Sequence, residues 1–533
     1  MLDSVCRRVR YRVAALLLLL LCYGASATTL GIEPARTSTN AGQTPEIATT
    51  ATPEARLNSA LAALDGIARS IMERSGVPGM AIAVVHADAV VYAKGFGVRH
   101  IGREATVDEN TVFQLASLSK PIGATVVAGI IGLGKIDWDT PVSRLMPSFS
   151  LKDSYVSREV TIGDLYCHRS GLPSHAGDTL EDLGFSREQI LHRLRWVPLN
   201  PFRMRYAYTN FGLTAAAMAV AKSTGLSWED LSARILYQPL GMNSTSSRYD
   251  DYRNRANKSV LHVRIDNHWE ARHERIADAQ SPAGGVSSSV MDMAKWMRLQ
   301  LADGMFNGRK IIAAKPLIQS RYPLMLAKPA ETSQGRAGFY GYGMGVGVDG
   351  TGRVRFSHSG AFLLGAATHF SLLPAENLGI VVLTNGMPVG APEAVAQTFL
   401  DLVELGGIQR DWLKVIGADM AQLYENPSRL AGLQPPESPR PARRLAFYTG
   451  DYKNRYHDPA RVFAEKGQIW LRLEPANQRF PLRHWSGDTF AYFPTGENAV
   501  GISAVDFKPG PGGKAGELII EFLNQNGLGG FSR

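Results

Sequence analysis

A short proline-rich segment divides this 533-residue chain into two parts of different character. Four prolines stand between positions 435 and 441, and such a run is a stiff linker that interrupts regular structure. Before it, apolar stretches at helical spacing mix with strand-like ones, whereas residues 443–533 form short β-rich runs broken by Gly, Asp and Pro. A chain of this length is also too long for a single core. We therefore expect a large mixed domain followed by a small antiparallel β-domain.

The N-terminus has the pattern of a secretory signal peptide. Four arginines between positions 7 and 12 precede an apolar run over 13–22, and small residues follow at 25–27. This order predicts a signal peptide over residues 1–27, cleaved after Ala27, and hence a periplasmic or secreted protein. The run is too short to span a bilayer comfortably, and no later stretch reaches roughly 18 uninterrupted apolar residues. We expect no transmembrane segment in the mature chain.

The remaining boundaries follow from composition and periodicity. Residues 28–57 are rich in Thr, Ala, Pro and Ser without a hydrophobic period, which predicts a disordered linker. The main domain is expected over 58–405, followed by a helix and proline-rich linker over 406–442 and the β-domain over 443–533. Within the main domain the pattern predicts a hairpin around Ala87 and Asp88, a buried helix over 122–133, and strands over 354–356, 366–373 and 380–383.

Composition excludes several function classes. The net charge of +9 is spread over the chain without a basic run interleaved with aromatics, so we expect no nucleic-acid partner. Two of the three cysteines lie in the predicted signal peptide, and Cys167 alone cannot form an intramolecular disulfide. No histidine–carboxylate spacing is typical of a metal site, and no helix start follows the glycines of 341–347. We expect neither a metal nor an organic cofactor.

A Ser-x-x-Lys tetrad, Ser117 to Lys120, precedes the predicted buried helix. On a helix, residues three apart share a face, so the hydroxyl and the amine lie side by side. A lysine held neutral can take the serine proton and activate the hydroxyl as a nucleophile; a tyrosine whose pKa neighbouring cations lower can do the same. Two further motifs follow in order, Tyr208-Thr209-Asn210 and His358-Ser359-Gly360.

With these motifs the chain resembles the serine β-lactamase and penicillin-binding-protein family, in its class C-like branch. The similarity runs from residue 77 to 386. It is carried by QLASLSK (114–120), DLYCHRSGLP (164–173), YTNFG (208–212), QPLGM (238–242), PAGG (282–285) and VLTN (382–385). The resemblance implies an α+β fold, in which a domain with an antiparallel sheet and helices is joined by a helical subdomain, with the active site between them.

The resemblance also implies roles for the motif residues. Ser117 corresponds to the acylated nucleophile and Lys120 to its proton partner, while Tyr208 corresponds to the tyrosine that relays protons. Asn210 corresponds to the amide that orients the substrate.

The resemblance places the third motif on a strand at the edge of the site. His358, Ser359 and Gly360 are thus expected to contact substrate. The backbone N–H groups of Ser117 and Ala361 would form an oxyanion hole, where donors stabilise the charge that develops on the carbonyl oxygen.

One departure concerns His358, because class C β-lactamases usually carry lysine there. A histidine at this position resembles the pattern of certain D-alanyl-D-alanine carboxypeptidases, D-aminopeptidases and related esterases. Two interpretations stay open: a charged His358 that holds a substrate carboxylate, or a neutral ring that supports Tyr208 by a hydrogen bond.

The expected function is that of a secreted serine hydrolase that forms an acyl-enzyme on a small amide or ester. A D-amino-acid peptide or peptidoglycan fragment is the first expectation and a carboxylesterase the alternative. A penicillin-binding sensor or scaffold with little turnover is an alternative of another class. The C-terminal domain is expected either to recruit a partner or, as a lipocalin-like barrel, to cover the site.

Overall fold

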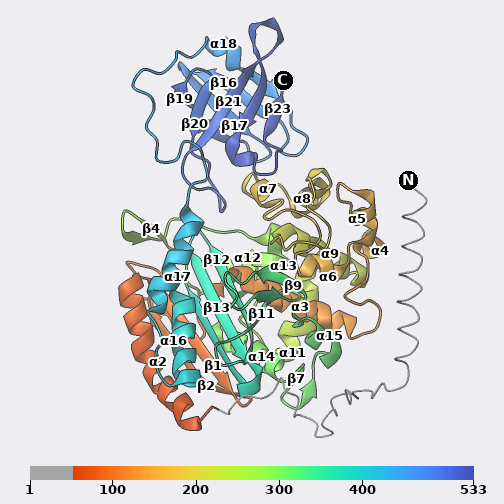
Figure 1. The fold of residues 1–533 in the computed structure, drawn as a ribbon, viewed down its shortest axis with the longest axis vertical. Coiled ribbons are helices and arrows are strands. Elements are labelled where there is room, and N and C mark those ends of the chain that lie inside the picture. The colour runs from red at the N-terminus through yellow and green to blue at the C-terminus, as the bar shows by residue number, and fades with distance from the viewer. Residues whose placement is uncertain (1–51) are drawn as a thin grey trace, which may run out of the picture. The chain divides into compact units, whose positions relative to one another are not determined.

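The computed structural model describes residues 52–533 (Figure 1). The predicted signal peptide and most of the predicted linker lie outside the described residues. Helix α2, Glu54–Ser75, begins inside the predicted linker, so the boundary at residue 57 is wrong. Pro53 occupies the N-cap, Glu54 places an acid in the first turn, and Leu57 is buried. A carboxylate near a helix N-terminus is favourable, and the apolar contact of Leu57 fixes the first turn.

An eight-stranded antiparallel sheet forms the centre of the main domain. Its order is β2-β1-β14-β13-β12-β11-β10-β9. The strands are β1 Gly79–His86, β2 Ala89–Gly97, β9 Met325–Lys328, β10 Gly338–Tyr340, β11 Gly345–Val348, β12 Val354–Phe362, β13 Ala366–Leu373 and β14 Leu378–Thr384. The predicted hairpin is confirmed: Ala87 and Asp88 turn with φ of 48° and 63°, the paired positive values of a tight hairpin turn.

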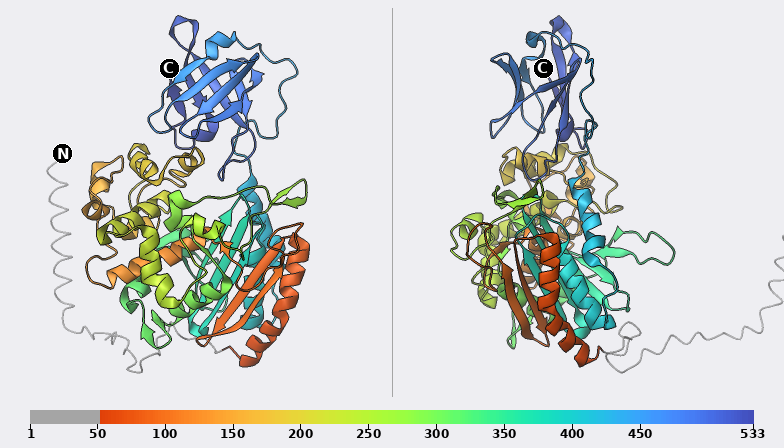
Figure 2. Two further views of the ribbon diagram at one scale, coloured as in Figure 1. Left: turned by 180° about the vertical axis from the view of Figure 1, so that it is seen from behind. Right: turned by 90° about the vertical axis from the view of Figure 1, so that its left-hand side faces the viewer.

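Helices cover both faces of the sheet. α2 and α16, Ala391–Leu405, pack on one face and α14, Val290–Leu301, on the other (Figures 1 and 2). The alternation of side chains along β1 matches this arrangement. Met80, Ile82 and Val84 join the core beneath α2 and α16, and the residues between them join the core on the opposite side.

A helical subdomain surrounds two buried helices, α3 (Ser119–Ile131) and α9 (Asn210–Thr224). The predicted buried helix over 122–133 is thereby confirmed. The short helices around them are α4 Val142–Leu145, α5 Ser154–Glu159, α6 Ile162–Tyr166, α7 Asp178–Asp182, α8 Arg187–Arg193, α10 Trp228–Ser232, α11 Gln238–Leu240, α12 Tyr249–Arg253, α13 Ser281–Gly284 and α15 Ala314–Gln319. Small strand pairs join this layer: β3 Phe113–Gln114 with β6 Ser287–Ser288, β4 Val263–Ile265 with β5 His268–Glu270, and β7 Met305–Phe306 with β8 Arg309–Lys310.

The C-terminal domain is antiparallel, as predicted. Helix α17, Trp412–Ala421, precedes the proline-rich segment, and α18, Leu445–Tyr448, follows it. One sheet contains β15 Gly450–Tyr452, β16 Ala460–Glu465, β17 Gln468–Leu473 and β18 Gln478–Pro481. The other contains β19 Arg483–Ser486, β20 Thr489–Tyr492, β21 Ser503–Pro509, β22 Ala515–Ile520 and β23 Gly530–Ser532.

These strands form two sheets rather than one closed barrel. The chain passes from the first sheet to the second at Leu482, and a single bridge joins Lys453 to Ser532. Aromatic rings meet between the sheets: Tyr452 on β15 contacts Phe507 on β21, and Phe480 on β18 contacts Tyr492 on β20. Each sheet therefore buries one face against the other. Within residues 52–533, none of the helices combines the length and apolar character needed to cross a membrane.

Candidate active site

The Ser-x-x-Lys tetrad lies where the main sheet meets the helical subdomain. Ala116–Leu118 form a 3₁₀ turn that leads directly into α3. Ala116 has a φ of +48°, a conformation that costs energy for a residue with a Cβ and that gathers at functional sites. Ser117 is partly exposed and Lys120 is buried. The turn therefore presents the hydroxyl to solvent while the amine one turn later stays inside.

The amine of Lys120 makes three polar contacts. Its Nζ lies 3.0 Å from Ser117 Oγ, 2.7 Å from Asn210 Oδ1 and 2.9 Å from the carbonyl oxygen of Ala283. Burial lowers the pKa of Lys120 to about 7, although the charge of Asp178 acts to raise it. A neutral amine has two N–H groups and one lone pair, and the two carbonyl oxygens can only accept. The lone pair is then left facing Ser117, which is the geometry of a general base.

Asp178 fixes the orientation of the Asn210 amide. Asn210 Nδ2 donates to Asp178 Oδ2 over 3.0 Å, so the amide oxygen must turn toward Lys120. His175 Nδ1 lies 3.0 Å from the same carboxylate oxygen, and Asp178 raises the pKa of His175 through that hydrogen bond. Sequence reasoning missed both residues. Their only signal is a His and an Asp three apart between two recognised motifs, and that spacing is common on any helix start.

Tyr208 donates its hydroxyl to Ser117 Oγ over 2.7 Å, and its ring lies 4.5 Å from Lys120 Nζ. His168 holds this segment in place, because its Nδ1 accepts the backbone N–H of Thr209. Burial raises the pKa of the Tyr208 phenol above its ordinary value. The phenol therefore stays protonated at neutral pH, so Lys120 rather than Tyr208 is the candidate base, and Tyr208 can donate a proton.

His358 lies beside these groups with both ring nitrogens occupied. Nδ1 is 2.6 Å from the carbonyl oxygen of Ser359, and a carbonyl can only accept, so Nδ1 carries a proton. Nε2 is 2.8 Å from the Tyr340 hydroxyl and accepts from it. Desolvation, together with the charge of Lys120, lowers the pKa of His358 to about 3. This geometry favours the neutral ring over the carboxylate anchor, with Tyr340 rather than Tyr208 as its partner.

The Ser359 side chain does not join the site. Its Oγ lies 2.9 Å from His369 Nδ1 on β13. Side chains alternate across a strand, so the face that carries His358 toward the nucleophile carries Ser359 away from it. The hydroxyl of Ser359 therefore lies away from the nucleophile, and the predicted contact of Ser359 with substrate stays a prediction. The strand predicted over 354–356 in fact continues to Phe362, and this extension sets the alternation.

Gly360 allows β12 to approach the nucleophile. A Cβ at this position would lie 2.3 Å from the carbonyl oxygen of Leu115 and 3.0 Å from the backbone nitrogen of Ser117. Any larger residue would push the strand away from the tetrad. The close approach brings the β12 backbone beside the Ser117 N–H, as the predicted oxyanion hole of Ser117 and Ala361 requires; that hole remains a prediction.

Similarity to known proteins agrees with the division of the chain. The family described as Beta-lactamase matches residues 64–404. A second family, described as Domain of unknown function (DUF3471), matches residues 434–527. The first match covers the sheet, the helical subdomain and all the site residues above, and the second covers the C-terminal domain.

Individual relatives are distant. Penicillin-binding protein 4 of Amycolatopsis lactamdurans is 28% identical over 320 residues, which are 58% of this chain and 81% of that protein. The D-alanyl-D-alanine-carboxypeptidase/endopeptidase AmpH of Escherichia coli (strain K12) is 23% identical over 64% of this chain and 89% of its own. Unguisins hydrolase ungD' of Aspergillus campestris (strain IBT 28561) is 27% identical, but the match spans only 45% of that protein.

Solved structures share the fold. The octameric penicillin-binding protein homologue from Pyrococcus abyssi superposes with a TM-score of 0.57 at 19% identity, covering 86% of this chain and 98% of that chain. A class C beta lactamase from Rhodobacter sphaeroides gives 0.50 at 20% identity, covering 63% of this chain and 98% of its own. Because the family match spans more than half of the sequence and contains the whole candidate site, this chain belongs to the Beta-lactamase family and is a serine hydrolase.

Proposed function

We propose that this serine hydrolase cleaves a small amide or ester of a D-amino-acid peptide or peptidoglycan fragment through an acyl-Ser117 intermediate. The observation that carries the mechanism is the position of Lys120 Nζ, 3.0 Å from Ser117 Oγ with both its N–H groups directed to carbonyl oxygens. A neutral amine so held accepts the hydroxyl proton as Oγ attacks the substrate carbonyl carbon.

The remaining groups complete the acylation step. The carbonyl oxygen gains negative charge and would accept the N–H groups of Ser117 and Ala361. Tyr208, protonated and already bonded to Oγ, gives its proton to the leaving group as the tetrahedral adduct breaks down. The ammonium of Lys120, which lies against the Tyr208 ring, then gives its proton to the Tyr208 phenolate, so that both groups return to their starting protonation states. A water molecule then attacks the acyl carbonyl carbon and loses a proton to the base. The bond to Ser117 Oγ breaks, and Oγ regains its proton as the acid leaves.

Two observations support a D-amino-acid peptide or peptidoglycan fragment as the substrate. Relatives over most of their length include a penicillin-binding protein and a D-alanyl-D-alanine-carboxypeptidase/endopeptidase. The N-terminal pattern over residues 1–27 further suggests that the protein is exported to the periplasm or beyond, where peptidoglycan fragments are found.

A carboxylesterase is the second candidate, and a specific observation favours it. A substrate carboxylate needs a cation at the edge of the site, whereas His358 is neutral with both nitrogens bonded to the protein. A neutral ester requires no such partner. The two candidates therefore differ in one measurable property, the preference for a substrate with a free carboxylate.

Covalent labelling tests the proposed chemistry. Wild type should form a one-to-one adduct with a fluorophosphonate and with a fluorescent penicillin, seen by intact-protein mass spectrometry, and Ser117→Ala should form neither. Ser59→Ala serves as the matched control, because Ser59 is exposed on α2 and bonds only the carbonyl oxygen of Ala55. An adduct that persists in Ser117→Ala would place the nucleophile elsewhere.

Turnover then separates the candidates. Release of p-nitrophenol from p-nitrophenyl esters and of p-nitroaniline from D-aminoacyl anilides should be steady with wild type and absent from Ser117→Ala. Hydrolysis of esters alone would favour the carboxylesterase. Stoichiometric acylation without steady turnover on any substrate would contradict both and indicate a penicillin-binding sensor.

A further inference from the structure

A cavity of about 470 Å³ lies between the main domain and the C-terminal domain, next to the candidate active site. The main domain lines it with His175, Asp178 and Leu363, among others. The C-terminal domain contributes the loop 494–500 and residues of the following strand, and the connecting segment 423–428 closes a third side.

This cavity adjoins the catalytic groups. Asp178, on its wall, bonds the Asn210 amide, and the His175 ring centroid lies 6.1 Å from that of Tyr208. Leu363 stands two residues beyond Ala361 at the end of β12. A carbonyl oxygen held at the Ala361 N–H would place the acyl group beside this strand, so substituents of the acyl group extend toward Leu363.

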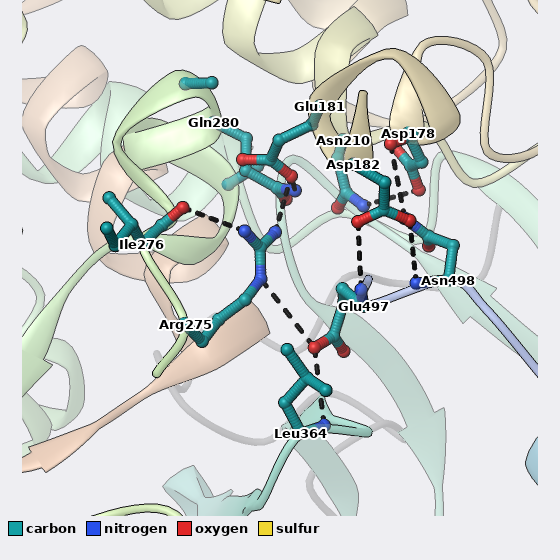
Figure 3. Close-up of polar contacts among 12 residues, drawn as sticks. Asp178, Glu181, Asp182, Asn210, Arg275, Ile276, Gln280, Leu364, Glu497 and Asn498 are labelled. Carbon is teal, nitrogen blue, oxygen red and sulfur yellow. Dashed lines mark hydrogen bonds and ion pairs between the residues drawn. The ribbon is translucent and has the colours of Figure 1, made fainter. Parts of the chain in front are cut away.

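The wall from the C-terminal domain is fixed by a set of hydrogen bonds to Asp182 at the end of α7 (Figure 3). The Asp182 carboxylate accepts the Glu497 N–H over 2.9 Å, the Asn498 N–H over 3.0 Å and Asn498 Nδ2 over 2.9 Å. Asn498 Nδ2 also lies 3.2 Å from the carbonyl oxygen of Asp178. Charge-assisted bonds of this kind hold the loop in a defined position.

Glu497 attaches the same loop to the end of β12. Its Oε1 accepts the Leu363 N–H over 2.7 Å, and its Oε2 lies 3.7 Å from Arg275 Nε. Arg275 in turn bonds Glu181 Oε2 over 2.5 Å. The loop of the C-terminal domain is therefore built into the rim of the site, from which it contributes Val500 to the cavity wall.

The lining of the cavity selects against negative charge. Its apolar side chains come from both domains and include Leu363, Val500, Ile502 and Phe522. Its ionisable side chains are the carboxylates of Asp178, Glu425 and Glu521 together with His175, and no lysine or arginine lines it. One carboxylate oxygen of Asp178, which is almost fully buried, has no hydrogen-bond partner. An apolar group fits this surface, whereas an anionic one would meet three carboxylates and a single histidine that Asp178 already engages.

We propose that this cavity is a substrate subsite, completed by the C-terminal domain, which binds an apolar substituent of the acyl group that carries no negative charge. The proposal rests on the acyl-Ser117 chemistry proposed above and adds which part of the substrate is selected, and by which domain. The C-terminal domain is thus a specificity-determining part of the enzyme.

A series of p-nitrophenyl esters from acetate to hexanoate tests the subsite in the full-length protein. With wild type, kcat/KM should rise by up to about fourfold for each methylene that becomes buried. The mono-p-nitrophenyl ester of adipic acid, which ends in a carboxylate, should lose that gain. Val500→Trp fills the cavity and should lower kcat/KM for hexanoate about tenfold or more, while acetate changes less than twofold.

Two further variants keep the test decisive. Val500→Ala enlarges the cavity without crowding it and should shift the preference toward longer chains. Leu445→Trp is the matched control, since Leu445 is exposed on the same domain outside the lining. If deacylation is slower than acylation, the rate of the initial burst of p-nitrophenol release gives the acylation rate for each ester.

The outcomes separate the two proposals. Equal changes for acetate and hexanoate in both Val500 variants would overturn the subsite and leave the acyl-enzyme intact. A wild-type preference for the adipate ester over hexanoate would overturn it as well. Failure of Ser117 to acylate with any ester would instead refute the proposed function.

Discussion

Two buried basic side chains of the main domain, Lys120 and Arg275, differ in what surrounds them. Lys120 Nζ contacts a hydroxyl and two neutral carbonyl oxygens, and burial lowers the pKa of this lysine to about 7. Burial acts in the same direction on Arg275, but the charges of Glu181 and Glu497 overcome it and raise the pKa of the guanidinium. Burial thus makes a proton acceptor of Lys120, whereas the facing carboxylates keep the Arg275 guanidinium charged.

The comparison shows why buried charge alone does not mark chemistry. The Lys120 cluster consists of Lys120 and the groups its amine contacts, on Ser117, Asn210 and Ala283. It includes the partly exposed hydroxyl of Ser117, which can react. The Arg275 cluster consists of Arg275, Glu181 and Glu497. Glu497 accepts the backbone N–H groups of Leu363 and Leu364, just after β12, so the cluster holds the two domains together. Asp178 stands between them, bonded to Asn210 on one side and approached by Asn498 on the other.

The largest effect is expected from Lys120→Met, which keeps the volume of the side chain and removes the base. We expect kcat/KM for p-nitrophenyl acetate to fall by about 10³-fold or more. In wild type, kcat/KM should rise with pH through about 7, because the amine must lose its proton before it can accept that of Ser117. That rising limb should be absent from the residual activity of the variant.

Thermal unfolding of Lys120→Met provides the control for folding. A retained limb near pH 7 in the variant would mean that another group is the base. It would also remove the distinction between the two cations, because Lys120 would then have only a structural role.

Asp178→Asn breaks the connection between the clusters. An amide at position 178 can present either its oxygen or its NH2 group, so the orientation of the Asn210 amide would no longer be fixed. We expect kcat/KM to fall about tenfold to a hundredfold. Asp178 raises the pKa of Lys120, so its neutralisation should also move the rising limb to lower pH. A purely structural role for Asp178 would lower activity without moving the limb, and a pH profile of the variant distinguishes the two.

The Lys120 cluster was largely predictable because its parts are local in sequence. Ser117 and Lys120 are three apart on one helix, and Tyr208 and Asn210 flank a helix start, so short motifs encode their positions. For Ser359 the motif gives the identity of the residue but not the face of the strand on which its hydroxyl lies. The strand itself was predicted to end at 356, before the residues whose alternation matters.

The Arg275 cluster could not be predicted in this way. Glu497 meets Leu363 across 134 positions, and Asn498 meets Asp182 across 316. No periodicity or motif encodes such contacts, because they arise only when two separately folded domains dock. The spacing of apolar residues predicted a mixed main domain and an antiparallel C-terminal domain. The division of the C-terminal domain into two sheets, and its position beside the site, could not be predicted from the sequence.

His358 provides a smaller test of which groups titrate in the site. Desolvation lowers the pKa of His358 to about 3, so the ring stays neutral from pH 5 to 9. The ratio of kcat/KM for a carboxylate-bearing ester to that for a matched neutral ester should therefore stay within about twofold across this range. A ratio that falls as pH rises through about 6.5, the ordinary pKa of histidine, would restore the carboxylate anchor. His358→Lys, whose charge persists, should then flatten the decline.

The smallest effect is expected from Glu497→Gln, which tests the Arg275 cluster and leaves Lys120 and its contacts unchanged. Burial raises the pKa of Glu497 to about 8, against the charge of Arg275, which lowers it. An acid whose pKa is higher in the folded state stabilises the fold fully below its unfolded pKa of about 4.5 and loses that contribution as pH rises to about 8. Wild type should therefore become less stable between pH 5 and pH 9.

Glutamine resembles the protonated carboxyl group at every pH, so Glu497→Gln should reduce this decline by a few degrees in Tm, roughly what a small free-energy change gives in a large domain. Part of the decline should remain, because burial also raises the pKa of Asp182, to about 6. Glu465→Gln, an exposed change on the same domain, should leave the profile unaltered. If Arg275 instead keeps Glu497 ionised throughout, Glu497→Gln would lower Tm by the same amount at every pH. The cluster would then be a fixed ion pair, and docking of the C-terminal domain would not depend on pH through Glu497.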